Sequence, residues 1–412
     1  MENRLNRLFV SLTGAAALFV MLFALLAPAP AKLPYDNRAP SRFSWRDPDA
    51  YFFDRLPHRT ALLKLCRSLE FALGKNAYGG AFRGKSGYIF SNENTDEAVL
   101  SRNLAALAAF AETVDTPLYT ALVPSKTDAL PGLLPPLYAA ERDALWETAK
   151  TAPGAVDLLP TLRMRGGEGK YIYYRGDHHL TSLGAYYVYC ALAAPLGMRA
   201  AEAEDFSVSV VRADFSGSDA RRLLTDTGDT VALFRARGDG ALTVTTDGGT
   251  RRGLYDFDAL AGDDAYGVFP GYGAGYTQIA HGEGRARILL LCDSYGCALA
   301  PFLARQYDVD MLDLRYSGMD VSALCRTRGY TAVLCCCGID TLAAHEILFK
   351  LQRYPRLTRA DTLSDGKKLA LDIVIVLGGR SAHLRPLPRQ PEFSSPESPT
   401  EFFGSGNCAG RG

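Results

Sequence analysis

The chain has 412 residues, of which 48% are hydrophobic and 22% are charged, a composition typical of a globular protein with one large domain or two moderate ones. Its 45 basic residues balance its 45 acidic residues, and no basic stripe stands out. This balance argues against nucleic acid as a partner.

The N-terminal segment predicts a membrane helix. Residues 8–27 contain no charge and are long enough to cross the roughly 30 Å hydrocarbon layer. Two arginines precede them, which by the positive-inside rule leaves the N-terminus in the cytoplasm and the rest of the chain outside. A cleaved signal peptide is the alternative, since residues 27–31 are small, but its apolar region would be long for one. We expect residues 1–32 to be an uncleaved anchor and residues 33–50 to be a tether.

The nine cysteines predict neither a disulfide framework nor a zinc site, because their number is odd and no CxxC pair occurs. Residues 335–337 are three cysteines in an apolar run, which favours a role in the core. Cys292 and Cys297 flank a serine turn, so a disulfide between them stays open from the sequence.

Apolar periodicity and turn residues predict the elements before residue 160, namely a hairpin at 82–90, a helix ending near 114, a strand at 118–124, a helix at 138–151 and a strand at 156–159. Asn94 and Glu97 have the spacing of a capping box at the start of the first helix. Ser125, Lys126 and Asp128 follow the first long strand at its carboxyl end, where a site could lie. A solvated loop is the simpler interpretation of these three residues.

A second polar cluster combines a carboxylate with two imidazoles. The β-rich residues 171–174 enter a glycine turn that presents Asp177, His178 and His179 just before a further helix. Asp177 and His179 share one side, because adjacent residues in an extended or turn backbone point to opposite sides. A carboxylate that orients an imidazole is the base half of a serine triad. The pair could instead cap the helix or bind a metal, for which only His281 is a further candidate ligand.

The second half of the chain changes character twice. Residues 200–285 alternate as strands do and include a glycine and aromatic loop at 269–276, so we expect a β-rich insertion that covers or flanks a site. Tyrosines in such a loop suit stacking on sugar rings, and a mobile loop pinned by a few aromatics is an equal alternative. A regular α/β pattern follows, with strands expected at 287–292, 309–315, 331–337 and 368–377, helices at 297–304, 321–326 and 340–351, and a disordered tail at 381–412. The helix after the histidine turn, expected at 182–194, precedes the β-rich residues.

Ser294 lies at a predicted strand-to-helix turn. The apolar run 288–292 reads as a strand buried on both faces, and it stops at Asp293. In open α/β sheets ligands bind beyond the carboxyl ends of the strands, and the N–H groups of the next helix can stabilise an oxyanion. Ser294 is therefore a candidate nucleophile if a base reaches it. Taken alone, a serine at this position is more often a helix N-cap.

Together these motifs resemble the bacterial DHHW protein family. The stretch YYRGDHHLT resembles the family signature, with Leu180 where the name-giving tryptophan would stand. The resemblance runs in order over roughly residues 51–340. It also rests on the segments FFDRLPHR, GKSGYIF, VPSK, DSYG, LAPFL and DLRY.

The resemblance implies a fold. The DHHW family is similar to the alginate O-acetylation proteins, whose SGNH-hydrolase-like domain is circularly permuted, so that an aspartate-x-histidine motif precedes the nucleophilic serine. It therefore implies an α/β protein in which residues 51–380 form a three-layer α/β/α domain with a parallel sheet, a β-rich insertion and an N-terminal transmembrane helix.

The resemblance also implies residue roles, with Ser294 as nucleophile, His179 as general base and Asp177 as the carboxylate that orients it. The oxyanion hole would include the Ser294 N–H, and Arg315 is a candidate second donor. The alternative for Arg315 is a salt bridge to Asp313 or Asp320.

The function expected from the sequence is an O-acyltransferase or esterase outside the cytoplasm, which transfers or removes acetyl groups on a cell-surface polysaccharide. A single N-terminal helix would hold it in the cell membrane. The resemblance implies a membrane-bound O-acyltransferase as the acetyl donor and a polysaccharide as the acceptor. No metal and no organic cofactor are expected.

Two other functions fit the sequence. One is a catalytically silent glycan-binding or scaffold component of a polysaccharide-modification machinery, and the other is a soluble esterase of the acetyl-xylan type. A Ser294 buried as a helix cap with no imidazole near it would favour the scaffold.

Overall fold

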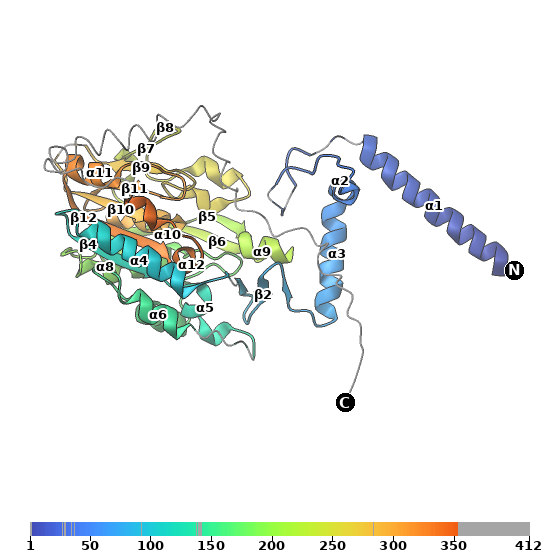
Figure 1. Cartoon of the computed structure of the whole chain (residues 1–412), viewed down its shortest axis with the longest axis horizontal. Helices are drawn as coiled ribbons and strands as arrows, with labels where there is room; N and C mark the ends of the chain where they lie inside the picture. Colours follow the sequence, from blue (N-terminus) through green and yellow to red (C-terminus); the bar gives the residue numbers. More distant parts are fainter. Residues whose placement is uncertain are drawn as a thin grey trace, which may run out of the picture. The chain divides into compact units, whose positions relative to one another are not determined.

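A seven-stranded sheet, in the order β4-β12-β10-β11-β9-β7-β8, forms the centre of the α/β domain (Figure 1). The computed structural model describes residues 2–352 except 27, 29, 34, 37, 92, 137, 139–141 and 283, so the strand expected at 368–377 and the tail at 381–412 lie outside the described residues. The first four strands of the sheet are parallel, and they are β4 (Leu118–Val123), β12 (Tyr330–Gly338), β10 (Arg287–Cys292) and β11 (Asp308–Leu312). Their carboxyl ends therefore meet at one edge, where α/β proteins place their ligands.

The remaining described elements surround this sheet. The helices are α1 (Glu2–Leu26), α2 (Pro48–Asp54), α3 (Arg59–Ala72), α4 (Glu97–Ala111), α5 (Lys126–Ala129), α6 (Asp143–Ala149), α7 (Leu159–Gly167), α8 (Ser182–Ala193), α9 (Ser218–Leu223), α10 (Ser294–Leu303), α11 (Val321–Arg328) and α12 (Ile339–Ala344). The strands are β1 (Ala77–Tyr78), β2 (Ala81–Arg83), β3 (Ile89–Ser91), β5 (Phe206–Phe215), β6 (Asp229–Ala236), β7 (Thr243–Thr246), β8 (Gly249–Arg252) and β9 (Tyr276–Ala280).

The sheet lies between two hydrophobic cores. Successive side chains of β10 point to opposite faces, so Ile288 and Leu290 belong to one core and Leu289 and Leu291 to the other. The first core contains the buried residues of α8 and α10, and the second contains those of α4, α6 and α12. This arrangement confirms the predicted α/β class with helices on both faces of a mostly parallel sheet.

The β-rich residues 200–285 divide into two parts. Strands β5 and β6 pair only with each other in the described chain, as an antiparallel ribbon. Strands β7, β8 and β9 extend the central sheet, because β9 pairs antiparallel with β11 and β7 pairs with β9. The second part of the insertion therefore extends the sheet beyond β11, on the side opposite to β4.

The helix predicted at 340–351 is interrupted. Helix α12 ends at Ala344, and a short 3₁₀ helix (Leu348–Gln352) follows. The buried Asn103 of α4 explains the break, because its amide donates to the carbonyls of Leu342 and His345 and its oxygen accepts the N–H groups of Ile347 and Leu348. One side chain thus replaces four hydrogen bonds that a continuous helix would have made itself.

Two smaller predictions were also wrong. Residues 156–159 form no strand, because Pro160 occupies the first turn of α7, where proline suits a helix start. The cap of α4 is Asp96 rather than Asn94, since its side chain accepts the N–H of Ala98 at 2.8 Å.

Helix α1 contains one segment, Arg4–Leu26, that is long and apolar enough to cross a membrane. A membrane anchor and a signal sequence share these properties. The predicted apolar N-terminal helix is therefore present.

Candidate active site

The turn after β10 presents Ser294 with its hydroxyl free of any capping role. Asp293 is the N-cap of α10, because its carboxylate accepts the N–H of Tyr295 at 3.0 Å. The same carboxylate accepts the N–H of Gly338 at the end of β12, at 2.9 Å, which ties the turn to the neighbouring strand. The interpretation of Ser294 as a cap, which the residue alone favoured, was therefore wrong.

Gly296 lets α10 start directly over β10. A Cβ at this position would lie 2.4 Å from the Cβ of Cys292 and 2.6 Å from its sulfur, so only glycine fits. Both Cys292 and Cys297 are buried free thiols. The close approach of α10 to β10 places Ser294 just beyond the carboxyl end of β10, where it is partly exposed.

The structure brings together the three residues that were predicted as a triad. The Nε2 atom of His179 lies 2.7 Å from the Oγ atom of Ser294, and its Nδ1 atom lies 2.5 Å from the Oδ1 atom of Asp177. Asp177 and His179 are only 2% and 3% exposed. The imidazole therefore bridges the carboxylate and the hydroxyl, as a general base and its orienting partner do.

The Asp177 carboxylate is held in its charged form. Its Oδ1 atom also accepts the N–H of His179 at 3.0 Å, and its Oδ2 atom accepts the N–H of Ser218 at 2.7 Å. Burial would raise the pKa of Asp177, but the imidazoles of His179 and His178 and the Ser218 N–H hold that pKa well below its ordinary value. An ionised Asp177 can stabilise an imidazolium on His179.

Gly217, directly before α9, sets the distance between this helix and Asp177. A Cβ on Gly217 would lie 2.1 Å from the Oδ2 atom of Asp177. We expect Gly217→Ala to displace the carboxylate and to lower kcat on an aryl acetate by roughly 100-fold, the cost of misplacing a catalytic group by about 1 Å. Gly167→Ala is the matched control, because a Cβ there meets no atom within 4 Å. Equal kcat values for Gly217→Ala and Gly167→Ala would show that the position of the Asp177 carboxylate does not depend on its contact with Gly217.

Lys126 is a buried cation next to the turn that carries Asp177 and His179. Its ammonium donates to the carbonyls of Tyr174 and Arg175 at 3.2 Å and to the carbonyl of Asp177 at 2.7 Å. It also pairs with Asp219 of α9 at 2.9 Å. The solvated loop that the sequence favoured around Lys126 was wrong, because the neighbouring Ser125 and Asp128 are buried as well.

Aromatic rings enclose the imidazole of His179. Tyr266 stacks on it with ring centroids 3.9 Å apart and planes inclined by 11°, and its hydroxyl donates to the carbonyl of Ser294 at 3.2 Å. Tyr272, from the predicted aromatic loop, lies edge-on with its centroid 6.3 Å from that of His179. Leu180, at the position where the resemblance implies a tryptophan, is buried in the core. Sequence reasoning missed Tyr266, which lies just before the loop that had been identified by its glycines.

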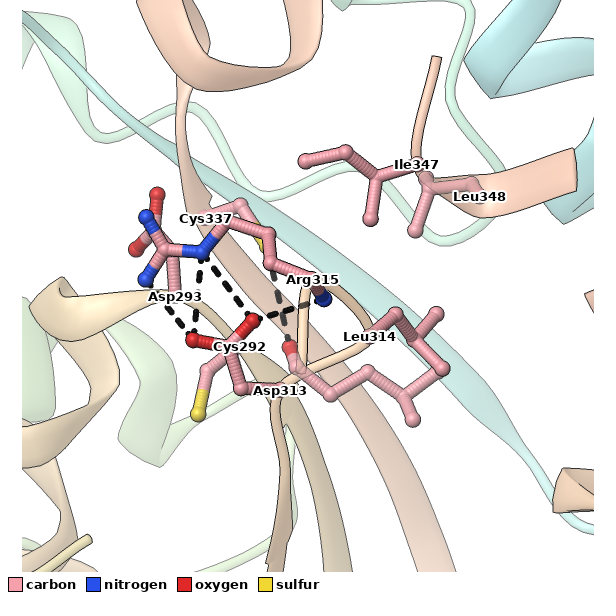
Figure 2. A pocket seen from close by; sticks show the side chains of 9 residues that line it. Cys292, Asp293, Asp313, Leu314, Arg315, Cys337, Ile347 and Leu348 are labelled. Carbon is pink, nitrogen blue, oxygen red and sulfur yellow. Dashed lines mark hydrogen bonds and ion pairs between the residues drawn. The ribbon is translucent and has the colours of Figure 1, made fainter. Parts of the chain in front are cut away.

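Arg315 lies beside the serine turn in an ion pair with Asp313. Its Nη2 and Nε atoms donate to the two carboxylate oxygens at 2.7 and 3.0 Å, and Figure 2 shows its guanidinium between the carboxylates of Asp313 and Asp293. Burial alone would lower the pKa of Arg315. The hydrogen bond to Asp313 and the charges of both carboxylates outweigh this effect, so the pKa lies above its ordinary value. In the described part of the chain its hydrogen bonds go to Asp313 and none to Ser294, so the alternative, a salt bridge to Asp313, is present, and a role in the oxyanion hole stays a prediction.

The ligand atoms of Asp177, His178 and His179 lie within 4.8 Å of one another, as a metal site would require. However, both ring nitrogens of His179 face protein partners, and the Nδ1 atom of His178 lies 2.8 Å from the Ser218 hydroxyl. His281 bonds to Asp308 at the amino end of β11, at the opposite edge of the sheet. The histidines are therefore arranged for hydrogen bonding rather than as a ligand set.

Comparisons with known proteins agree with this fold. A family model described as DHHW protein matches residues 87–311, more than half of the chain. A DHHW family protein from Eubacterium siraeum superimposes with a TM-score of 0.57 at 21% identity, over 68% of this chain and 98% of that one. PatB1 of Bacillus cereus with a sulfonyl adduct gives 0.53 at 18% identity, over 65% and 96%. The O-acetyltransferase domain of AlgJ from Pseudomonas putida gives 0.44 at 16%, over 67% and 95%. None of the curated proteins compared with the chain matches it.

Proposed function

Because this chain belongs to the DHHW protein family, we propose that it is a serine O-acyltransferase or esterase that acts on acetyl groups of a cell-surface polysaccharide outside the cytoplasm. The observation that supports the proposal is the hydrogen-bonded series from Ser294 through His179 to Asp177. Resemblance to the alginate O-acetylation proteins supports the choice of acetyl groups and polysaccharide.

In the first step, His179 Nε2 takes the proton of Ser294 as the Oγ atom attacks the carbonyl carbon of the acetyl donor. Asp177 stabilises the imidazolium that forms. The Ser294 N–H lies at the first position of α10, where an N–H has no intrahelical partner, and no described residue is recorded as its acceptor, so it can donate to the oxyanion. Arg315 is the candidate second donor.

Collapse of the tetrahedral intermediate leaves an acetyl ester on Ser294, and His179 returns the proton to the leaving oxygen. In the second step, a sugar hydroxyl or water gives its proton to His179 and attacks the ester, which releases the Ser294 hydroxyl. A sugar hydroxyl makes the protein a transferase, and water makes it an esterase. Tyr272, which is partly exposed and lies next to His179, is in position to stack on the acceptor sugar.

The location and the partners are part of the same proposal. We place α1 in the cell membrane as an uncleaved anchor, with the α/β domain outside the cytoplasm. A membrane-bound O-acyltransferase would supply the acetyl group to this side. The scaffold alternative gains no support, because Ser294 is not a cap and an imidazole lies 2.7 Å from its hydroxyl.

A covalent probe tests the nucleophile directly. We expect an arylsulfonyl fluoride to add one sulfonyl group to Ser294, because the Oγ–S bond forms as fluoride leaves and His179 takes the proton. Peptide mass spectrometry of the full-length protein would locate the adduct. His179→Ala should abolish the adduct, whereas Ser322→Ala, which removes another buried serine, should keep it. An unmodified Ser294 in the folded wild-type protein would support the glycan-binding alternative.

A further inference from the structure

Helix α3 has an unusual polarity, with its apolar side chains turned outward. Its exposed residues carry no charge, and they are Ala61, Leu62, Leu65, Cys66, Ser68, Leu69 and Ala72. Leu65 and Leu69 are each 57% exposed, and Leu73 just after the helix is 88% exposed. Leucines at spacings of three and four residues form one continuous stripe. On a helix whose outer face contacts water, these exposed positions would carry polar side chains.

The charged residues of α3 lie away from this stripe and have partners. Arg59 pairs with Asp36 at 2.7 Å, and Lys64 pairs with Asp226 at 3.1 Å. Arg67 is buried, pairs with Glu70 and lies over the ring of Tyr78. The helix therefore does not lack charge, but its charged side chains form ion pairs whereas its leucines face outward.

The start of α3 is tied to the chain that leaves α1. Asp36 pairs with Arg59, and Arg38 donates to both carboxylate oxygens of Asp54 at 2.7 and 2.8 Å. The ten residue-to-residue steps from Leu26 to Asp36 span at most about 36 Å even when the chain is fully extended. If α1 crosses a membrane, α3 must therefore begin close to that membrane.

The segment before α2 carries groups typical of a membrane–water interface. Trp45 is 88% exposed and Phe43 is 43% exposed. Arg42 and Arg46, on either side, are exposed as well. Tryptophan is enriched at the headgroup level of bilayers, and arginines there contact lipid phosphates. These residues lie on the stretch that links the anchor to α3.

We propose that the leucine face of α3, together with Trp45, lies on the bilayer in which α1 is anchored. Leu62, Leu65 and Leu69 would insert at the boundary between headgroups and acyl chains, as interfacial helices do. This lipid contact is independent of the chemistry at Ser294. It would orient the α/β domain, because Phe71 of α3 packs against a buried cluster that includes Ala220 and Leu223 of α9, the helix whose first N–H is donated to Asp177.

The native Cys66, in the centre of the leucine face, provides the test. Full-length protein in lipid nanodiscs would carry an environment-sensitive fluorophore on Cys66, with Cys190, Cys325 and Cys408 replaced by serine. The matched control moves the label to the exposed turn between β7 and β8, by Asp247→Cys in a Cys66→Ser background. We expect spin-labelled phospholipids to quench the label at position 66 severalfold more than the label at position 247.

A triple variant of the leucine face checks that the quenching depends on these side chains. Leu62→Asn, Leu65→Asn and Leu69→Asn together should abolish the quenching and leave the thermal unfolding temperature nearly unchanged, because these side chains are exposed. Equal quenching at positions 66 and 247 would overturn the proposal. A Cys66 label that is shielded from water but not quenched by lipid would also overturn it, in favour of a protein occupant such as a second copy or residues 353–412.

Discussion

Ser294→Ala is expected to lower kcat for aryl acetate hydrolysis by roughly 10⁴- to 10⁶-fold, the loss seen when a triad nucleophile is removed. His179→Ala should cause a loss of similar size, because in the proposed mechanism Nε2, which lies 2.7 Å from Oγ, takes the proton of the hydroxyl. The double variant should be no slower than either single variant, since residues that act as a unit are not additive. Rates would be measured on the full-length protein with a chromogenic acetate.

The control for this series is Ser322→Ala, which removes a buried hydroxyl outside the site and should keep the wild-type rate. Circular dichroism would confirm that all the variants fold. Additive losses from Ser294→Ala and His179→Ala would contradict a shared proton-transfer unit. Equal rates in wild type and Ser294→Ala would contradict the proposed nucleophile and favour a binding function.

The parallel core of the fold could be predicted from the sequence because buried strands leave a direct pattern. Apolar runs without alternation marked β10 and β12, and the structure buries both on two faces. The relation of Asp177 to His179 was equally local, since residues two apart in a turn share a side. The bond between their side chains confirms that geometry.

The burial of Lys126 and the break after α12 depend on contacts between residues far apart in the chain. Lys126 follows a strand and looks solvated, yet its carboxylate partner Asp219 lies 93 residues further on. The break after α12 depends on Asn103, more than 200 residues earlier. No window of sequence contains both members of either pair. Tyr266 was missed for the same reason, because only the folded chain shows that it stacks on His179.

Arg315 illustrates an intermediate case. The sequence offered an oxyanion donor or a salt bridge, and its neighbour Asp313 lies only two residues away. The strand expected at 309–315 ends at Leu312, because Asp313 begins a turn in which its side chain accepts the N–H of Arg315. Local turn chemistry therefore accounts for the salt bridge, whereas a catalytic role depends on a bound acyl group.

Lys126→Met is expected to destabilise the folded protein strongly. Methionine keeps much of the apolar stem but removes the charge that compensates Asp219, which is 1% exposed. The Oδ1 atom of Asp219 already has no hydrogen-bond partner in the described chain, so the substitution leaves the carboxylate uncompensated. Breaking a buried pair in this way costs about 3–5 kcal/mol, which should lower the unfolding temperature by about 10 °C.

A second variant separates stability from catalysis. Lys126→Met combined with Asp219→Asn removes both charges, so it should recover part of the unfolding temperature. It should not recover kcat, because the carbonyls of Tyr174, Arg175 and Asp177 still lack the ammonium that holds the turn. The exposed Lys150→Met is the control and should change neither quantity. A double variant with wild-type kcat would show that Lys126 stabilises the fold without positioning the triad, whereas a slow but folded double variant requires that the buried ammonium sets the geometry of His179.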